Sequence, residues 1–210
     1  MIEIINIKYS DNFIIIELNT GEPFKLTPEI FNMYSLSKGK SIENSLYQQL
    51  KEESIKINCR YKALNYLAIR SRSYYEIQNY LIKKEFSKNI IKEILDALQD
   101  SGYINDYDYA VRYINNRKKA KVVGRNILKS DLYKKGINKD IIRKAIKESG
   151  AEDTDHDAVF ELAVKKLKTL ENKKNKIPKI IYFLKQKGFT EDEVRKAVKR
   201  LKNENEEEYI

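Results

Sequence analysis

The chain has 210 residues, of which 41% are hydrophobic and 34% charged, with a formal net charge of +10. The hydrophobic content is that of a folded protein, and the charge favours a polyanion or an anionic membrane surface as partner, although Lys-rich solvated helix faces produce the same excess. A single cysteine, Cys59, and a single histidine, His156, exclude an internal disulfide, a Cys-based zinc site and a histidine pair on zinc. No stretch approaches the roughly 20 apolar residues of a membrane helix and the start does not read as a signal peptide, so we expect a soluble, cytoplasmic protein.

The first residues alternate like β-strands. Runs of β-branched residues over 2–9 and 13–18 flank a polar cluster that suits a hairpin turn, and residues 24–26 fit a short third strand. These features predict a small antiparallel sheet at the N-terminus.

A helix is predicted directly after these strands. Thr27 can cap it and Pro28 can occupy its first position, and the helix is expected to stop near Gly39. Beyond Gly39 we expect only helices, the first of which is amphipathic and covers residues 41–57.

From about residue 58 the chain repeats itself. Leu81, Leu132 and Leu184 lie 51 and 52 residues apart and open the similar stretches "LIKKEFSKNIIKEIL", "LYKKGINKDIIRKAI" and "LKQKGFTEDEVRKAV". Their apolar positions match at helical spacing, which predicts one three-helix module in tandem. The predicted fold is mainly α, with three three-helix repeats in an elongated, curved molecule and a small strand-containing N-terminal extension. The predicted domains are residues 1–57, the repeats 58–104, 105–152 and 153–203, and an acidic tail at 204–210.

Each repeat is expected to turn at the same place. Gly136 and Gly188 suit the left-handed end of a helix, whereas Glu85 stands there in the first copy, so that corner is expected to be built differently. The next residue is apolar in every copy and is expected to fill the corner between two helices: Phe86, Ile137 and Phe189.

Capping residues mark the helix starts. Ser73 with Glu76, and Thr190 with Glu193, have the spacing of a capping box. Single caps are predicted at Ser87, at Asn105 or Asp106, and at Asn138.

No catalytic motif is recognised. The glycines never fall into a phosphate-binding pattern, and a Cys59–His156 nucleophile pair is a remote alternative. The cluster Asp153, Asp155 and Asp157 resembles the start of a calcium loop but lacks its turn glycine and its distal carboxylate, so helix capping explains it better. We therefore expect a binding protein with no enzymatic activity, no metal and no cofactor.

The most basic part of the chain lies in the second repeat, where residues 105–152 carry 13 basic and 6 acidic side chains. Basic side chains beside aromatic ones can hold phosphates and stack on bases; alternatively, the tyrosines pack in the core and the charges are solvated. The corresponding inter-helix loops of the other repeats are also basic. The candidate partner-binding or DNA-binding residues are Arg70, Arg72, Arg112, Arg117, Lys118, Lys119, Lys121, Arg125, Lys173, Lys174, Lys176 and Lys179.

Four stretches are similar to a known family. "ALNYLAIRSRSYYEIQNYLIKK", "GYINDYDYAVRYINNR", "GRNILKSDLYKKGINKDIIRKAI" and "LKQKGFTEDEVRKAV" closely resemble the RecX regulatory proteins of bacterial recombination, over residues 58–202. The resemblance implies tandem three-helix repeats, binding to the RecA recombinase filament and, in general, inhibition of its ATP hydrolysis and strand exchange. Some members bind DNA directly. Glu85 departs from the glycine that is typical of the family.

Two functional hypotheses remain open. The favoured one is a monomeric regulator, in the first place an inhibitor, that lies along a RecA–DNA filament with a basic edge toward single- or double-stranded DNA. The alternative is a stand-alone DNA-binding protein whose modules act like helix-turn-helix units. Its candidate recognition helices, residues 87–99 and 190–201, are mixed in charge and poor in side chains that read base edges. Neither hypothesis involves a membrane.

Overall fold

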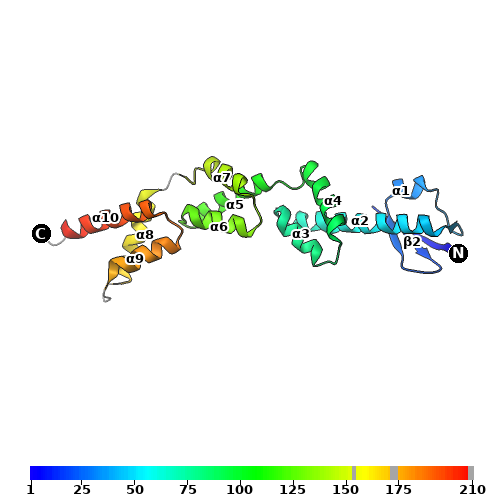
Figure 1. Ribbon diagram of the computed structural model, residues 1–210, viewed down its shortest axis with the longest axis horizontal. Coiled ribbons are helices and arrows are strands. Elements are labelled where there is room, and N and C mark those ends of the chain that lie inside the picture. Colours follow the sequence, from blue (N-terminus) through cyan, green and yellow to red (C-terminus); the bar gives the residue numbers. More distant parts are fainter. Residues whose placement is uncertain (153–154, 171–174, 208–210) are drawn as a thin grey trace. The chain divides into compact units, whose positions relative to one another are not determined.

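The computed structural model describes residues 1–152, 155–170 and 175–207, with side chains up to residue 204 (Figure 1). The chain forms two compact units, Met1–Ile104 and Asn105–Ile210. Within the described ranges it is mostly helical with a small strand region at the N-terminus, as predicted. None of the helices in these ranges combines the length and the apolar character that crossing a membrane requires.

The first unit begins with an antiparallel sheet. Its strands are β1 (Ile2–Tyr9), β2 (Ile14–Leu18), β3 (Phe24–Leu26) and β4 (Ser41–Ile42), in the order β3-β2-β1-β4. Inward side chains alternate along the strands, as in a sheet that is covered on one face. They form a core with Phe31 of α1 (Pro28–Met33), Leu36 and Leu50. Thr27 caps α1 as predicted, but the prediction of helices alone beyond Gly39 is wrong, because β4 pairs with the start of β1.

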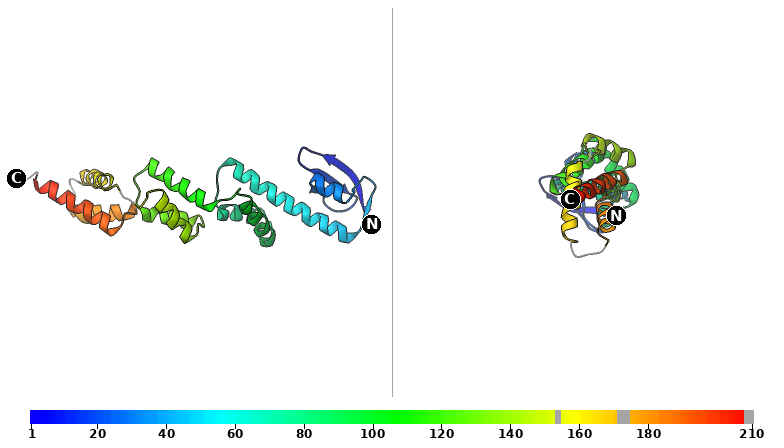
Figure 2. Two further views of the ribbon diagram at one scale, coloured as in Figure 1. Left: turned by 90° about the horizontal axis from the view of Figure 1, so that it is seen from above. Right: turned by 90° about the vertical axis from the view of Figure 1, so that its left-hand side faces the viewer.

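A single long helix joins the sheet to the first repeat. Helix α2 spans Asn44–Ile69 without a break, and Figure 2 shows it continuous from the strand region into the repeat. Leu50 packs in the core of the sheet, whereas Cys59 and Ala63 pack in the core of the repeat. The predicted boundary between residues 57 and 58 therefore falls inside a helix, and the predicted helix 41–57 begins and ends too early.

The rest of the described chain consists of helices in sets of three, each set with its own hydrophobic core. The last part of α2 packs with α3 (Tyr74–Ile82) and α4 (Lys88–Asp100) in the first repeat. The second unit holds the other two sets: α5 (Asp106–Ala120), α6 (Arg125–Lys134) and α7 (Lys139–Glu148), then α8 (His156–Lys168), α9 (Lys176–Gln186) and α10 (Glu191–Glu207). Leu81, Leu132 and Leu184 have no exposed surface, which explains why leucine recurs at these places.

The three corners share one backbone conformation. In each corner the amide directly after the left-handed residue returns to the recurring leucine: Phe86 N–H donates to the Leu81 carbonyl at 3.4 Å, Ile137 to Leu132 at 3.1 Å, and Phe189 to Leu184 at 3.3 Å. This is the Schellman pattern of a helix that ends in a left-handed residue. Glu85 adopts φ +67°, close to the +76° of Gly136 and the +85° of Gly188, so the prediction of a different first corner is wrong. The first repeat accepts a strain of about 1 kcal/mol to keep the same turn.

The predicted caps are present. Ser73 and Glu76 form a complete capping box, and Thr190 and Glu193 exchange the same pair of hydrogen bonds at 3.4 and 2.6 Å. The other predicted N-caps of the repeats are found at Ser87, Asn105 and Asn138.

The start of α6 is joined to the corner of the third repeat by backbone hydrogen bonds. Gly124 N–H donates to the Lys187 carbonyl at 2.8 Å, and Asn126 N–H donates to the Gly188 carbonyl at 3.1 Å. A β-carbon at Gly124 would lie 2.1 Å from the carbonyl carbon of Gly188, so only glycine permits this approach. The second and third repeats therefore meet backbone against backbone.

Candidate functional site

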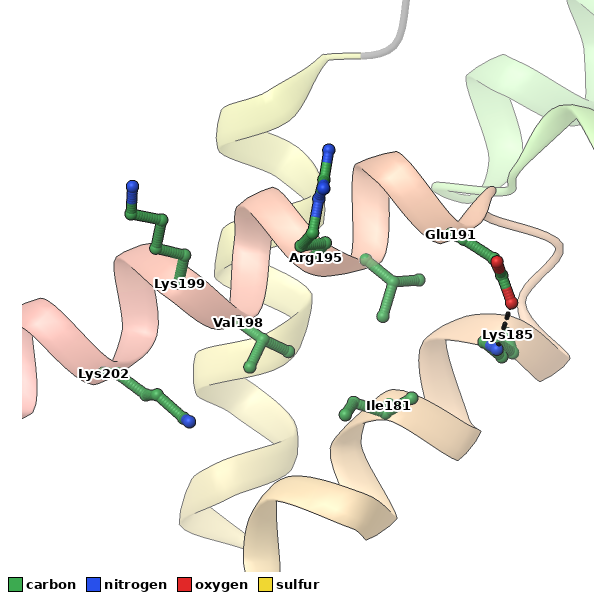
Figure 3. A pocket seen from close by; sticks show the side chains of 8 residues that line it. Ile181, Lys185, Glu191, Arg195, Val198, Lys199 and Lys202 are labelled. Carbon is green, nitrogen blue, oxygen red and sulfur yellow. Dashed lines mark hydrogen bonds and ion pairs between the residues drawn. The ribbon is translucent and has the colours of Figure 1, made fainter.

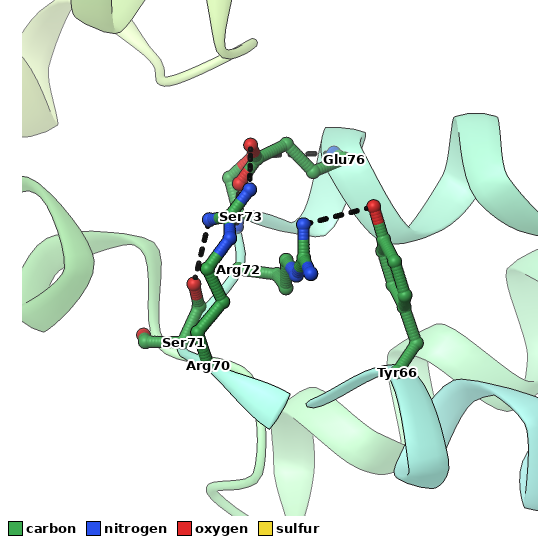
Figure 4. A network of polar contacts seen from close by, with 6 residues as sticks. All are labelled: Tyr66, Arg70, Ser71, Arg72, Ser73 and Glu76. Carbon is green, nitrogen blue, oxygen red and sulfur yellow. Dashed lines mark hydrogen bonds and ion pairs between the residues drawn. The ribbon is translucent and has the colours of Figure 1, made fainter. Parts of the chain in front are cut away.

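The two arginines of the first inter-helix loop serve the fold. Arg70 donates to the Ser71 carbonyl at 3.1 Å and to the Glu76 carboxylate at 3.2 Å, and that carboxylate also accepts the Ser73 N–H of the capping box (Figure 4). The guanidinium of Arg72 lies 3.8 Å from the centre of the Tyr66 ring and donates to the hydroxyl of the same residue at 3.0 Å. Both guanidinium groups therefore hold the start of α3 against the end of α2.

An aromatic stack extends this packing. Tyr66 and Tyr80 stack with ring centroids 4.0 Å apart, so that Arg72 continues a stack between α2 and α3. Within the described part of the chain the Nε atom of Arg72 is buried and has no acceptor. Cation–π contacts of this kind stabilise most when they are shielded from water. Arg72 is consequently half-buried and held by this packing, while half of the Arg70 side chain stays exposed.

A similar commitment occurs in the second repeat at Arg117. Its guanidinium donates to the Asp131 carboxylate at 2.9 Å, and the Tyr113 hydroxyl donates to the same carboxylate at 2.8 Å. Burial and the hydrogen bond to Asp131 raise the pKa of Tyr113 to about 12, so the phenol keeps its proton. Arg117 thus ties α5 to α6.

Lys118 also has a structural role. Its Nζ donates to the carbonyls of Ser149 and Gly150 at 2.9 and 3.1 Å. These carbonyls lie at the end of α7, where a helix has unsatisfied acceptors and a partial negative charge. Lys118 therefore caps α7.

Four candidates in this region carry charges that no carboxylate of the described residues neutralises. Arg112, Lys119 and Lys121 are exposed and Arg125 is half-buried, and the described residues provide no ion pair to any of them. The neighbouring tyrosines are occupied differently: Tyr109 is buried in the core, and Tyr107 donates to Glu148. The core interpretation of the tyrosines is confirmed for Tyr109, which leaves the cations as the available groups.

Three basic side chains converge on one hollow in the second unit. A depression of about 250 Å³ is lined by Lys118, Lys121 and Arg125, by apolar side chains of both repeats, and by the single carboxylate of Asp155. Phe189 and Val159 supply part of its apolar wall. A mixed basic and apolar hollow can hold a phosphate beside an apolar face.

The candidates of the third repeat are less well placed. Lys173 and Lys174 lie outside the described residues. Lys176 is half-buried at the start of α9, and Lys179 is exposed but makes a contact within the chain. Neither Lys176 nor Lys179 lines the hollow.

Sequence reasoning missed a second basic surface on α10. Arg195, Lys199 and Lys202 line a groove between α9 and α10, together with Lys185 of α9. Their spacing of four and three residues puts the α10 cations along one side of the helix. That spacing is visible in the sequence "VRKAVKRLK", from which a basic side of this helix could have been predicted.

The acidic residues at the start of α8 have structural roles in the described chain. Asp155 caps α8 by accepting the amides of Asp157 and Ala158, and Asp157 pairs with Arg200 at 2.5 Å. This confirms capping for Asp155, whereas Asp153 lies outside the described residues. No group of three metal-ligating side chains occurs among the described residues.

Cys59 is expected to resist thiol reagents in the native protein. The side chain has no exposed surface, and burial raises the pKa of its thiol to about 11. At pH 8 only about one thiol in a thousand is then ionised, and that one is covered by the repeat. Absorbance with an aromatic disulfide reagent should rise slowly in buffer and at once in guanidinium. An immediate reaction in buffer would contradict the packing of α2.

Comparisons with known proteins agree with the repeat architecture. The family model for the first three-helix domain of RecX matches residues 59–98. A protein named Regulatory protein RecX from Bacillus subtilis is 31% identical over 188 residues, which cover 88% of this chain and 70% of that protein. The protein of the same name from Clostridioides difficile is 30% identical, with 85% and 84% covered. A protein of this name from Listeria monocytogenes is 33% identical, and the match covers 80% of this chain and 63% of that protein.

Solved structures show the same fold. A crystal structure of regulatory protein RecX superposes with a TM-score of 0.77 at 20% identity, covering 93% of this chain and 98% of that one. The structure of RecX from Lactobacillus salivarius gives 0.64 at 27% identity, covering 70% and 97%. The level of identity to the Bacillus and Clostridioides proteins over most of both chains decides the assignment. This chain belongs to the RecX family.

Proposed function

We propose that the protein is a non-enzymatic regulator of the RecA recombinase that binds along the RecA–DNA filament and inhibits its ATP hydrolysis and strand exchange. The relatives that carry the name regulatory protein support the regulatory role. The proposal places the protein in the cytoplasm as a monomer that needs no cofactor.

One observation carries the binding part of the proposal. Lys119, Lys121 and Arg125 are unneutralised by any described carboxylate, and two of them line the hollow where the second and third repeats meet. Unpaired cations on a surface attract phosphates. Their binding releases counterions condensed on the nucleic acid, which favours the complex. We infer that this surface faces DNA or an acidic face of the filament.

The repeat architecture suggests how binding inhibits. Each repeat has its own core, so each can present a separate contact without help from its neighbours. Contacts of moderate strength that share one chain act together, because the second binds at a high effective concentration. A regulator that bridges neighbouring recombinase protomers in this way hinders the movements that accompany nucleotide turnover.

The test is co-sedimentation with RecA filaments on single-stranded DNA, together with the ATPase rate of the same filaments. We expect the protein to pellet with the filament and to lower the rate. A chain that neither pellets nor changes the rate is not a regulator of this kind. Sequence-dependent binding to duplex DNA without recombinase would favour the alternative, a stand-alone DNA-binding protein.

A further inference from the structure

A groove between α9 and α10 has the composition of a protein-docking surface. It has a volume of about 440 Å³ and is lined by three aliphatic residues, Ile181, Val194 and Val198, and by five charged ones. Figure 3 shows Ile181 and Val198 between the two helices, with the Lys185–Glu191 pair near the turn that joins them. The volume and the aliphatic floor suit apolar side chains from a partner.

Two of the residues that line this groove are not repeated in the other two copies. When the repeats are aligned on their recurring leucines, Val194 and Val198 match apolar residues in every copy, as the shared core requires. Ile181, however, corresponds to Gln78 and Lys129, and Lys202 corresponds to Gln99 and Gly150. The three-helix fold therefore does not need these two side chains, and a role outside folding explains them better.

The charges around the groove are unequal. Glu191 accepts from Lys185 at 2.7 Å, and Asp192 accepts from Arg195 at 2.7 Å, so these cations are paired. Lys199 and Lys202 are exposed, and no described residue forms an ion pair with either. Within the described side chains, the groove thus offers two positive charges without an ion-pair partner beside an aliphatic floor.

We propose that this groove binds an acidic amphipathic helix of a partner protein. Apolar side chains of that helix pack on Ile181 and Val198, and its carboxylates face Lys199 and Lys202, as in other helix-in-groove complexes. A nucleic acid fits less well. Among the described residues that line the groove none is aromatic, so bases have nothing to stack on.

The experiment measures peptide binding to the full chain by fluorescence anisotropy. The probe is a labelled synthetic helix with leucines at every third or fourth position and glutamates between them, and a second probe has lysines in place of the glutamates. We expect the acidic probe to bind and the basic probe not to bind. The variant Lys199→Glu/Lys202→Glu should weaken the acidic probe by about tenfold or more, because attraction becomes repulsion at two sites.

Two further variants separate the possible outcomes. Lys144→Glu/Lys147→Glu on α7 makes the same charge change at the same spacing on exposed residues away from the groove, and it should leave peptide affinity unchanged. Ile181→Gln gives the third repeat the residue found in the first and should weaken the probe without unfolding the chain.

The proposal is overturned if the acidic probe does not bind, or if the α7 control weakens it equally. Displacement of the bound probe by a single-stranded oligonucleotide would also overturn it, and would assign the groove to nucleic acid. Because the assay contains no recombinase, its result is independent of the filament proposal.

Discussion

Replacing Gly124 with alanine is expected to separate the second repeat from the third and to destabilise the second unit by about 3 kcal/mol. The new β-carbon would lie 2.1, 2.2 and 2.3 Å from Gly188 C, Gly188 O and Phe189 N. All three are backbone atoms, so no side-chain rotation relieves the clash. Gly124 has φ −76°, which alanine tolerates, and the effect therefore reports the contact and not backbone strain.

Urea unfolding and hydrogen exchange measure this effect. The amides of Gly124 and Asn126, which donate across the junction, should lose their protection in the variant. Gly102→Ala is the control, because its φ is +75° and its β-carbon would meet nothing within 4 Å, so it costs only the strain of about 1 kcal/mol. Cys59 lies in the first unit and should stay unreactive in the Gly124 variant. Unchanged protection of both amides would disprove a close backbone contact.

Local rules explain why the repeat was predictable. A Schellman corner needs a left-handed residue and an apolar contact at fixed spacing, and a capping box needs two side chains three residues apart. These patterns are complete within a few residues. The turn of the second repeat can therefore be predicted from Leu132, Gly136 and Ile137 alone. The prediction for Glu85 is wrong because the same contacts stabilise the turn strongly enough to impose a left-handed conformation on a residue other than glycine.

The N-terminal errors have a different cause. β4 is two residues long and exists because Ile2 and Glu3 pair with it across almost 40 residues. Helix α2 passes through the predicted boundary because one part of it packs on the sheet and another part in the repeat. Both features depend on distant partners, which helical or strand periodicity does not reveal.

The same limit applies to the candidate site. Composition identified the basic region, but it could not tell a free cation from one that is used by the fold. Arg117 finds its acceptor at Asp131, and Lys118 finds its acceptors at Ser149 and Gly150, on other helices. The guanidinium of Arg72 packs on the ring of Tyr66, six residues earlier in the chain. Only the packed structure separates these three from the cations that remain available.

Reversing the available cations should abolish most of the binding. We expect Lys119→Glu/Lys121→Glu/Arg125→Glu to weaken association with the filament, or with single-stranded DNA, by on the order of tenfold to a hundredfold at low salt. The described residues give none of the three side chains an ion pair, so the helices should keep their stability. Lys118 is left unchanged because it caps α7. The measurement is a binding titration at several salt concentrations, with circular dichroism to verify the fold.

The matched control changes the same number of charges elsewhere in the second unit. Arg143→Glu/Lys144→Glu/Lys147→Glu lies on exposed positions of α7 and gives the same net charge. Long-range attraction depends mainly on net charge and affects both variants, whereas direct phosphate contacts are lost only where the cations meet the polymer. The salt dependence should therefore become shallower for the first variant and change little for the control. If both variants lose affinity equally, the basic surface acts through its overall field, and the hollow between the repeats is not the contact.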